Sequence, residues 1–289
     1  MSDVVLVESG QEDRVGRGRP VWLSFGLLVP FAFVVVLAVA GWAPQWLSSF
    51  DPEAVDPNAI LLPPDAQHWF GTDELGRDLF SRVVYGTSQS LTIGLGATLI
   101  ASLGGIVLGT TAALAPRPIG RLLLRLIDIL LAFPEMLLAL LVIAVLGRGP
   151  ANTLLAVGLA SIAGYARLIR SQVLHIKLSG YVEHAIALGE HPWTIIIRHI
   201  VPNAIRPLLI LATIGVGTSV LSASALSFLG LGVVPPAAEW GALLANGRNF
   251  LDIAPWTSLL PATVVALSVI SITLLGRRLQ TLLATGDLR

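Results

Sequence analysis

Six stretches of about 20 or more mainly apolar residues dominate this sequence of 289 residues. A helix needs about 20 such residues to cross the hydrocarbon core of a bilayer. The stretches are 21–43, 91–115, 122–146, 154–176, 208–231 and 256–275. Only 12% of the residues are charged, about half the share of a soluble domain. The sequence therefore predicts an all-α, polytopic membrane protein with about six transmembrane helices.

Lysine and arginine are unevenly distributed among the segments that join these stretches. If the N-terminus lies in the cytoplasm, the inner segments hold 14 of the 18 Lys and Arg residues, and the outer segments hold only Arg77, Arg82, Arg148 and Arg248. Cytoplasmic loops of membrane proteins carry such an excess of positive charge. We therefore predict a plasma-membrane protein with both termini in the cytoplasm, a flexible segment at 1–20 and a tail at 283–289.

The first apolar stretch, 21–43, follows three arginines, as the apolar region of a secretory signal would. The apolar region of a signal is only about 7–15 residues long. Because this stretch exceeds that length, we expect an uncleaved first transmembrane helix.

Residues 44–85 form a long outer segment between the first two stretches. Thr72 suits a helix N-cap, and the two acidic residues that follow it suit a first helical turn. Leu75, Leu79 and Val83 recur every four residues and make one apolar stripe. We expect a short amphipathic helix on the membrane surface here, which either seats the next span or gates the substrate path.

The only long inner segment is 177–206, which is too polar to cross a membrane. Tyr181, Ala185 and Leu188 have the spacing of one helix face. Gly189 suits the end of that helix, and Pro192 prevents its continuation. The pattern predicts a short helix in the cytoplasm whose apolar face docks in a groove of another protein.

Two carboxylates lie inside the third apolar stretch, where such groups usually face a cavity or a partner. Asp128 and Glu135 are seven residues apart, so we expect them on nearly the same helix face, as candidates for a translocation path. For Asp128 we favour an ion pair with Arg125. Glu135 follows Pro134, which should kink the helix. We expect Glu135 to meet a polar or cationic part of a cargo, the alternative being an interhelical hydrogen bond from a protonated carboxyl.

This chain lacks the residues or the residue spacing that several kinds of chemistry require. There is no cysteine, and the single lysine, Lys177, is not part of a glycine-rich phosphate-binding loop. Histidines 175, 184, 191 and 199 are seven to nine residues apart, which does not match the spacing of a zinc site. We expect no enzyme activity and no metal or cofactor in this chain, with ATP and Mg²⁺ bound by partner subunits.

Small residues recur inside the spans at intervals of four. Gly105 and Gly109 form a GxxxG pair, and Thr213 and Gly217 form a second small pair. Such pairs let helix backbones approach closely within a membrane. We interpret them as packing positions.

Several segments, in one order, resemble the permease subunits of ABC importers, and most of all the C-type subunit of dipeptide, oligopeptide and nickel importers. Glu183-His184-Ala185 with Gly189 resembles the cytoplasmic EAA loop, in which His184 replaces the usual second alanine and Val201 the usual leucine. Further similar segments are 70–78, 128–134, 164–168 and 226–232. The resemblance covers about residues 20–280, and only the usual Asp-Pro ending is missing.

This resemblance implies a type I importer permease fold with its core at 86–282. It implies a second permease subunit as heterodimer partner, two cytoplasmic ABC ATPases, an extracytoplasmic substrate-binding protein and lipid around the spans, with no nucleic acid. The residues that would dock on the ATPase are Tyr181, Glu183, His184, Ala185, Leu188 and Gly189. Di- and oligopeptides are the implied cargo, with nickel chelates, glutathione-like compounds or haem as alternatives.

Functions of other classes fit the residues less well. A secondary transporter driven by an ion gradient commonly shows inverted repeats, and none is evident. A membrane-embedded enzyme needs converging acid, base or nucleophilic groups. A receptor or structural protein leaves the segment 177–206 without a purpose.

Overall fold

The computed structural model describes residues 21–285, with side chains for residues 27–281. In chain order the helices are α1 (Val21–Trp42), η1 (Pro44–Trp46), α2 (Leu79–Leu114), α3 (Arg117–Ala132), α4 (Glu135–Leu146), α5 (Pro150–Lys177), α6 (Gly180–Ala187), α7 (Pro192–Thr194), η2 (Ile195–Ile200), α8 (Val201–Phe228), α9 (Trp240–Gly247), η3 (Arg248–Phe250) and α10 (Trp256–Thr285). The described residues contain no strand, only an isolated bridge between Thr72 and Asp78. The all-α prediction is confirmed, and the N-terminal segment 1–20 and residues 286–289 of the tail lie outside the described residues.

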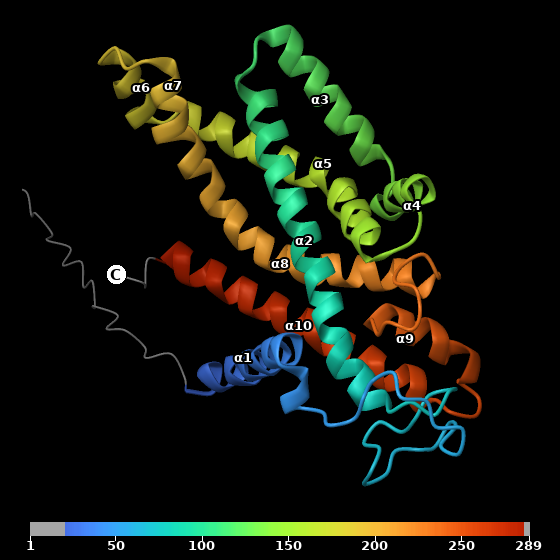
Figure 1. Ribbon diagram of the computed structural model, residues 1–289. Helices are drawn as coiled ribbons and strands as arrows, with labels where there is room; N and C mark the ends of the chain where they lie inside the picture. Colours follow the sequence, from blue (N-terminus) through green and yellow to red (C-terminus); the bar gives the residue numbers. More distant parts are fainter. Residues whose placement is uncertain (1–20, 286–289) are drawn as a thin grey trace, which may run out of the picture.

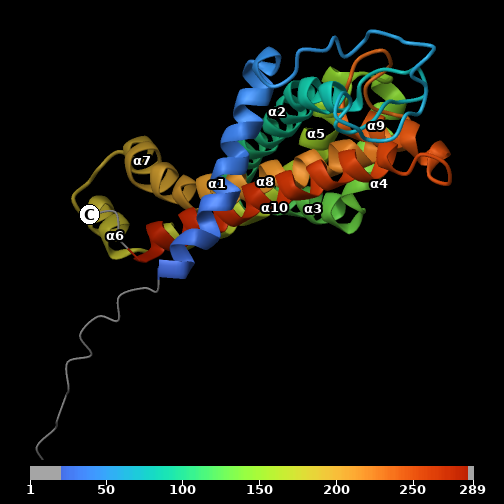
Figure 2. The same cartoon turned by 90° about the horizontal axis from the view of Figure 1, so that it is seen from below.

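α2 runs through the middle of the molecule and packs against α1, α3, α5, α8 and α9 (Figure 1). α6 and α7 lie at one end of the long helices. The segment between η1 and α2 lies with α9 at the opposite end, in this view and in the view turned by 90° (Figure 2). The two segments that the sequence singles out are therefore far apart, one at each end of the helices.

Four described helices are long and apolar enough to cross a membrane, and a bent pair, α3 with α4, adds a fifth span. α1 is a further apolar helix of 22 residues, and its side chains are described from Leu27 to Trp42. The second span begins earlier than predicted, because α2 starts at Leu79 and continues for 36 residues. The predicted apolar stretches thus correspond to α1, α2, the α3–α4 pair, α5, α8 and α10.

The third span breaks where a kink was expected. α3 and α4 meet at an angle of 94° across Phe133 and Pro134. Phe133 has extended backbone angles, which the residue before a proline favours, and Pro134 is the N-cap of α4. Asp128 and Glu135 therefore lie on two different helices, and the prediction that they share a helix face is wrong.

The predicted amphipathic helix beginning at Thr72 is not formed. Residues 72–78 make a turn instead, in which the Asp73 carboxylate accepts hydrogen bonds from the backbone N–H groups of Leu75 (2.8 Å) and Arg77 (3.0 Å). Aspartate side chains compete in this way with the backbone bonds of a helix. Gly76 adopts a left-handed φ of 74°, which a helix does not accept.

α2 begins only after this turn, with Asp78 as its N-cap. The Asp78 carboxylate accepts hydrogen bonds from the Ser81 backbone N–H at 2.8 Å and from the Ser81 hydroxyl at 2.5 Å. The apolar stripe that begins at Leu75 thus continues at Leu79 and Val83 inside the first turns of a long span.

The C-terminal part of the segment 177–206, from Pro192 onward, is helical. α7, η2 and α8 run on without interruption as one helix of 37 residues, Pro192–Phe228. Its part between Ile195 and Ile200 is a π-helix, which is wider than an α-helix. The inner segment therefore consists of α6, a short turn and the first turns of this long helix.

Glycines bring α2 and α5 together. A Cβ atom on Gly105 would lie 2.4 Å from the Cβ of Tyr165, and one on Gly109 would lie 2.4 Å from the backbone oxygen of Ala166. On α8, a Cβ atom on Gly217 would lie 3.2 Å from the hydroxyl of Thr273 and 3.3 Å from the backbone oxygen of Val269, both in α10. The small residues are packing positions, as predicted.

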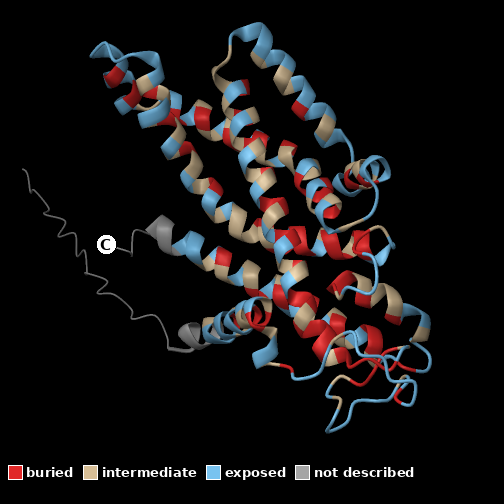
Figure 3. Ribbon diagram, viewed as in Figure 1, coloured by how far each residue is buried: buried red, intermediate tan, exposed pale blue. Residues whose placement is uncertain are grey.

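Figure 3 shows that α3 and α4 remain largely exposed, whereas buried residues gather where α2 crosses α8, α9 and α10. Only Ile127 of α3 and Ala139 and Ile143 of α4 are buried among the described residues of this pair. Their exposed apolar side chains include Leu122 and Leu141. This surface suits lipid or a second membrane protein.

Candidate functional site

α6 is fixed between the ends of two long helices. Its buried residues, Val182 and Ala185, belong to one apolar cluster with Val173 and Ile176 of α5 and Ile200 of η2. Burial of one aliphatic side chain of this size stabilises a fold by about 1.5–3 kcal/mol. The cluster therefore holds α6 against both α5 and the helix that continues into α8.

The exposed side of α6 carries large side chains. Leu188 is 83% exposed and Tyr181 is 46% exposed, and His184 lies between them at helical spacing. We call Tyr181, His184 and Leu188 the α6 face. Ala185 was expected on this face, but it is only 6% exposed because its short side chain is covered by the cluster around Val182.

α6 ends in a turn that requires a glycine. Gly189 has a φ of 78°, and its N–H donates to the carbonyl of Ile186 at 3.0 Å, while the N–H of Glu190 donates to the carbonyl of Ala185 at 3.1 Å. This pair of bonds is a Schellman motif, which satisfies the last carbonyl groups of the helix. No atom lies within 4 Å of a Cβ built on Gly189, so its constraint is the backbone angle.

Polar groups surround the α6 face. Glu183 and His184 are both exposed, and the Nδ1 atom of His184 lies 2.6 Å from the carbonyl oxygen of Gly180. Because a carbonyl only accepts, this Nδ1 donates. Nearby, the His199 ring and the Glu190 carboxylate form a pair at 3.2 Å. No group of three possible metal ligands occurs among the described residues.

Glu135 lies in the first turn of α4 and reaches across to α5. Its carboxylate accepts a hydrogen bond from the hydroxyl of Ser161. Glu135 also lines a small cavity with Val157 of α5 and with Ser222 and Leu226 of α8. Its place at the break between α3 and α4 puts an acid beside a helix N-terminus, where the helix dipole favours a negative charge.

Asp128 lies apart from Glu135 and remains exposed on α3. The expected ion pair between Asp128 and Arg125 is not formed, since none of the ion pairs within residues 27–281 joins them. Both side chains are exposed, and at such positions an ion pair contributes about 0–1 kcal/mol, too little to hold two flexible side chains together.

The opposite end of the molecule holds a buried charge network that sequence reasoning missed. The Asp73 carboxylate lies 2.7 Å from Nε of Arg77 and 3.4 Å from Nε of Arg82, and all three side chains are nearly inaccessible. The Arg82 guanidinium also donates to the carbonyl of Pro52 at 2.9 Å. The network ties the segment before α2 to the start of that helix.

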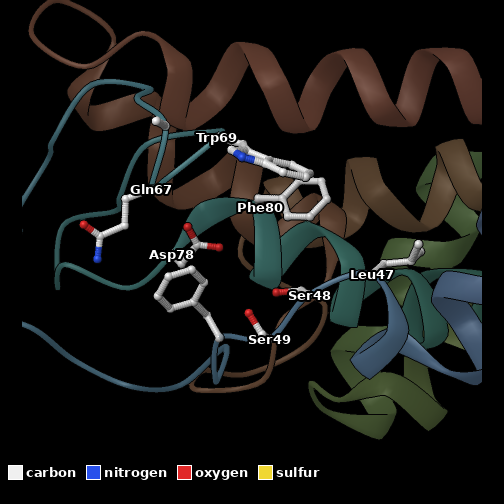
Figure 4. A pocket seen from close by; sticks show the side chains of 9 residues that line it. Leu47, Ser48, Ser49, Gln67, Trp69, Asp78 and Phe80 are labelled. Atoms are coloured by element: carbon white, nitrogen blue, oxygen red, sulfur yellow. The ribbon is translucent and has the colours of Figure 1, made fainter.

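Asp78 lines a cavity of about 350 Å³ beside this network (Figure 4). In Figure 4, Trp69 and Phe80 lie against each other on one side, with ring centroids 5.0 Å apart, and Ser48 lies below. The Asp78 carboxylate is already bonded, to Nδ1 of His68 at 2.9 Å and to Ser81. The cavity is thus lined by aromatic rings and a carboxylate that caps α2.

Glu239 is the most deeply buried acid among these groups, with 1% of its surface exposed. It caps α9 by accepting hydrogen bonds from the backbone N–H groups of Gly241 (2.9 Å) and Ala242 (3.0 Å), and it also accepts one from the hydroxyl of Ser90. Burial raises the pKa of Glu239 above its usual range, although these hydrogen bonds oppose the shift. The sequence signal was an acid directly before Trp240-Gly241, at an N-cap position.

Sequence comparison identifies the family of this chain. A family model described as "Binding-protein-dependent transport system inner membrane component" matches residues 105–286. Relatives include the probable D,D-dipeptide transport system permease protein of Escherichia coli K12, 37% identical over 96% of this chain and 94% of the relative. The dipeptide transport system permease protein of Alkalihalophilus pseudofirmus is 40% identical over 88% and 83%. The glutathione transport system permease protein of Pectobacterium atrosepticum is 39% identical over 86% and 82%.

Solved structures share the fold. An inward-facing methionine ABC transporter is similar with a TM-score of 0.57 and 18% identity, over 68% of this chain and 94% of that chain. An amino acid ABC transporter is similar with a TM-score of 0.56 and 17% identity, over 70% and 94%. These likenesses confirm the predicted type I permease fold. With the family match over most of the helical core, they lead to one conclusion: this chain belongs to the binding-protein-dependent transport system inner membrane components, the permease subunits of ABC transporters.

Proposed function

We propose that this chain forms half of the translocation path of an ABC importer and that α6 couples it to a cytoplasmic ATPase. The observation that carries this proposal is the two-sided character of α6. Its inner side is fixed to α5 and α8 through Val182 and Ala185, whereas its outer side exposes Tyr181 and Leu188. Large exposed apolar side chains on a short, firmly seated helix suit the groove of a partner protein.

The coupling follows from how α6 is held. A push on the α6 face acts on α5 and on the long helix of α8, because one apolar cluster joins the three. α5 in turn packs on α2 through Gly105 and Gly109 with no intervening side chains. Packed interiors resist compression and transmit strain. A movement of the docked ATPase is therefore transmitted through α6, α5 and α8 to the helices that line the translocation path.

The proposal includes the other components of such an importer. A second permease subunit covers part of the exposed apolar surface of α3 and α4. Two cytoplasmic ATPases bind ATP and Mg²⁺, as the family of this chain suggests; the single lysine, Lys177, lies outside any glycine-rich phosphate-binding loop. A binding protein delivers cargo at the end that carries α9. The excess of Lys and Arg supports the cytoplasmic placement of both termini and of α6.

Short peptides are the cargo that we propose. The relatives are named for dipeptide and glutathione transport, so glutathione-like compounds come next, with nickel chelates or haem as further alternatives. Glu135 is the group in the path that meets a polar or cationic part of the cargo. Its bond to Ser161 and its place in a cavity between α4, α5 and α8 support this role.

Charge introduced into the α6 face tests the coupling. The double variant Tyr181→Arg/Leu188→Arg, co-expressed with the cognate ATPases, should insert normally but retain little ATPase on purification. Val234→Arg is the matched control, because the exposure of Val234 (55%) lies between those of Tyr181 and Leu188, but Val234 lies in the loop before α9, at the opposite end. Retention of wild-type amounts of ATPase by the double variant would refute the docking role. Uptake driven by an ion gradient without ATP hydrolysis would refute the transporter class.

A further inference from the structure

A cavity of about 460 Å³ opens where the end of α2 and the start of α3 meet α5. Three arginines line it, Arg117 and Arg121 of α3 and Arg170 of α5. Small residues leave the space: Ala112 and Gly120 stand where larger side chains would fill it. The cavity lies at the α6 end of the molecule, far from the cavity at Asp78.

Within the described part of the chain, these three cations have no acidic partner. Every ion pair found within residues 27–281 involves other residues. Arg121 donates only to the backbone oxygen of Arg117, at 3.3 Å. The Nε atom of Arg170 is buried and has no hydrogen-bond partner among the described residues. A buried N–H without an acceptor is unfavourable, and like charges around one cavity repel each other.

The end of α2 explains part of this arrangement. Carbonyl groups at a helix C-terminus carry a partial negative charge that favours nearby cations. The carbonyl oxygens of Ala112 and Ala115 lie close to Gly120, at the mouth of the cavity. None of them accepts from Nε of Arg170, however, so the buried donor still requires an acceptor.

We propose that this cavity binds the phosphate group of an anionic ligand. Guanidinium groups match phosphate oxygens with paired, charge-assisted hydrogen bonds, and three of them converge here. The phosphate comes either from an anionic phospholipid or from a soluble phosphate compound. Leu124 of α3 adds an apolar side chain to the lining of the cavity, which suits the start of an acyl chain. With the orientation proposed above, the cavity lies at the cytoplasmic side, where basic pockets between membrane helices bind lipid head groups.

Charge-removing variants test the cavity. Arg121→Gln and Arg170→Gln each remove one guanidinium that lines it. Arg125→Gln is the matched control, because Arg125 lies one turn further along α3, is exposed and does not line the cavity. The full-length chain, purified in a mild detergent, would be titrated separately with phosphatidylglycerol, phosphatidylcholine and inorganic phosphate, and bound phospholipid would be counted by native mass spectrometry.

We expect saturable binding that Arg121→Gln and Arg170→Gln each weaken about tenfold or more, the effect of one lost charge-assisted contact. Arg125→Gln should change the affinity less than about twofold. Binding of phosphatidylglycerol but not of inorganic phosphate identifies a lipid site, and the reverse identifies a soluble ligand.

Two outcomes would overturn the proposal: no saturable binding of either anion, or equal weakening by all three glutamine variants. Arg170→Gln is set aside in this test if it fails to elute as a single species. Arg121 is exposed and lines the cavity, so Arg121→Gln alone then decides whether the cavity binds the anion. Retention of the ATPase is measured on the same samples. A failure of anion binding with ATPase docking intact is therefore distinct from a failure of the proposed function.

Discussion

Replacement of Gly109 by alanine tests the close contact between α2 and α5. A Cβ at this position would lie 2.4 Å from the backbone oxygen of Ala166, 3.0 Å from the Cβ of Ile169 and 3.1 Å from the backbone nitrogen of Arg170. All three atoms belong to the backbone of α5 or are attached to it. No side-chain rotation can therefore relieve the clash, and the two helices must move apart.

The size of the effect follows from two opposing terms. Overpacking costs about 1–3 kcal/mol, and a clash with backbone belongs in the upper part of this range. Alanine gains about 1 kcal/mol over glycine inside a helix, so Gly109→Ala should destabilise the fold by about 1–2 kcal/mol. Gly164→Ala in α5 is the matched control, because no atom lies within 4 Å of its Cβ. It should stabilise by about 0.4–1 kcal/mol.

The assay is reversible unfolding of the purified chain in mixed micelles by titration with sodium dodecyl sulfate, followed by circular dichroism. The two variants should differ by about 1.4–3 kcal/mol, with the wild type between them. A Gly109→Ala protein as stable as Gly164→Ala would show that α2 and α5 do not approach as closely as described, and the coupling argument would lose its basis.

Three further substitutions test other parts of the molecule. Asp73→Asn should lower the unfolding free energy by about 3–5 kcal/mol, because it leaves the buried Arg82 without a counter-charge and leaves Arg77 only its 3.3 Å contact with Glu74; a detergent unfolding titration measures this, and a change below about 1 kcal/mol would contradict the buried network. Burial raises the pKa of Glu239, so its protonated form favours folding, and this stability is lost as pH rises above about 4.5 and through the raised pKa. The melting temperature should therefore fall more between pH 5 and pH 8 in the wild type than in Glu239→Gln, and equal slopes would contradict the shift. Glu135→Gln should reduce uptake of cationic peptides more than of neutral ones, with Ser161→Ala as a control that keeps the carboxylate; unchanged cargo preference in transport assays would remove Glu135 from the path.

The spans could be predicted from sequence because their lengths and apolar content leave few alternatives. The residues at which helices begin or break could not be predicted in this way. Pro134 predicted a kink, but only the extended backbone of Phe133 turns the kink into a 94° break. Leu75, Leu79 and Val83 fit a separate amphipathic helix equally well until Asp73 is seen to bind the backbone of its own turn.

In the candidate site, too, local sequence did not predict which single side chains are buried. Helical spacing placed Tyr181, Ala185 and Leu188 together, yet in a helix as short as α6 the buried side is chosen by its neighbours on α5 and η2. Glu239 gave no signal beyond its position before Trp240, because its role depends on Ser90, which is 149 residues distant in sequence. Long-range contacts of this kind have no local pattern.

The uninterrupted helix of 37 residues from Pro192 to Phe228 has a mechanical consequence. At about 1.5 Å per residue it is about 55 Å long, well beyond the hydrocarbon thickness of about 30 Å. If α6 docks on an ATPase as proposed, this helix would act as a lever between the apolar cluster that holds α6 and the neighbourhood of α9. A tilt of about 10° around its middle displaces each tip by about 5 Å, roughly the pitch of one helical turn. The wider π-turn between Ile195 and Ile200 lies at the α6 end of this helix and Pro207 lies inside it, so a bend is expected at these two positions.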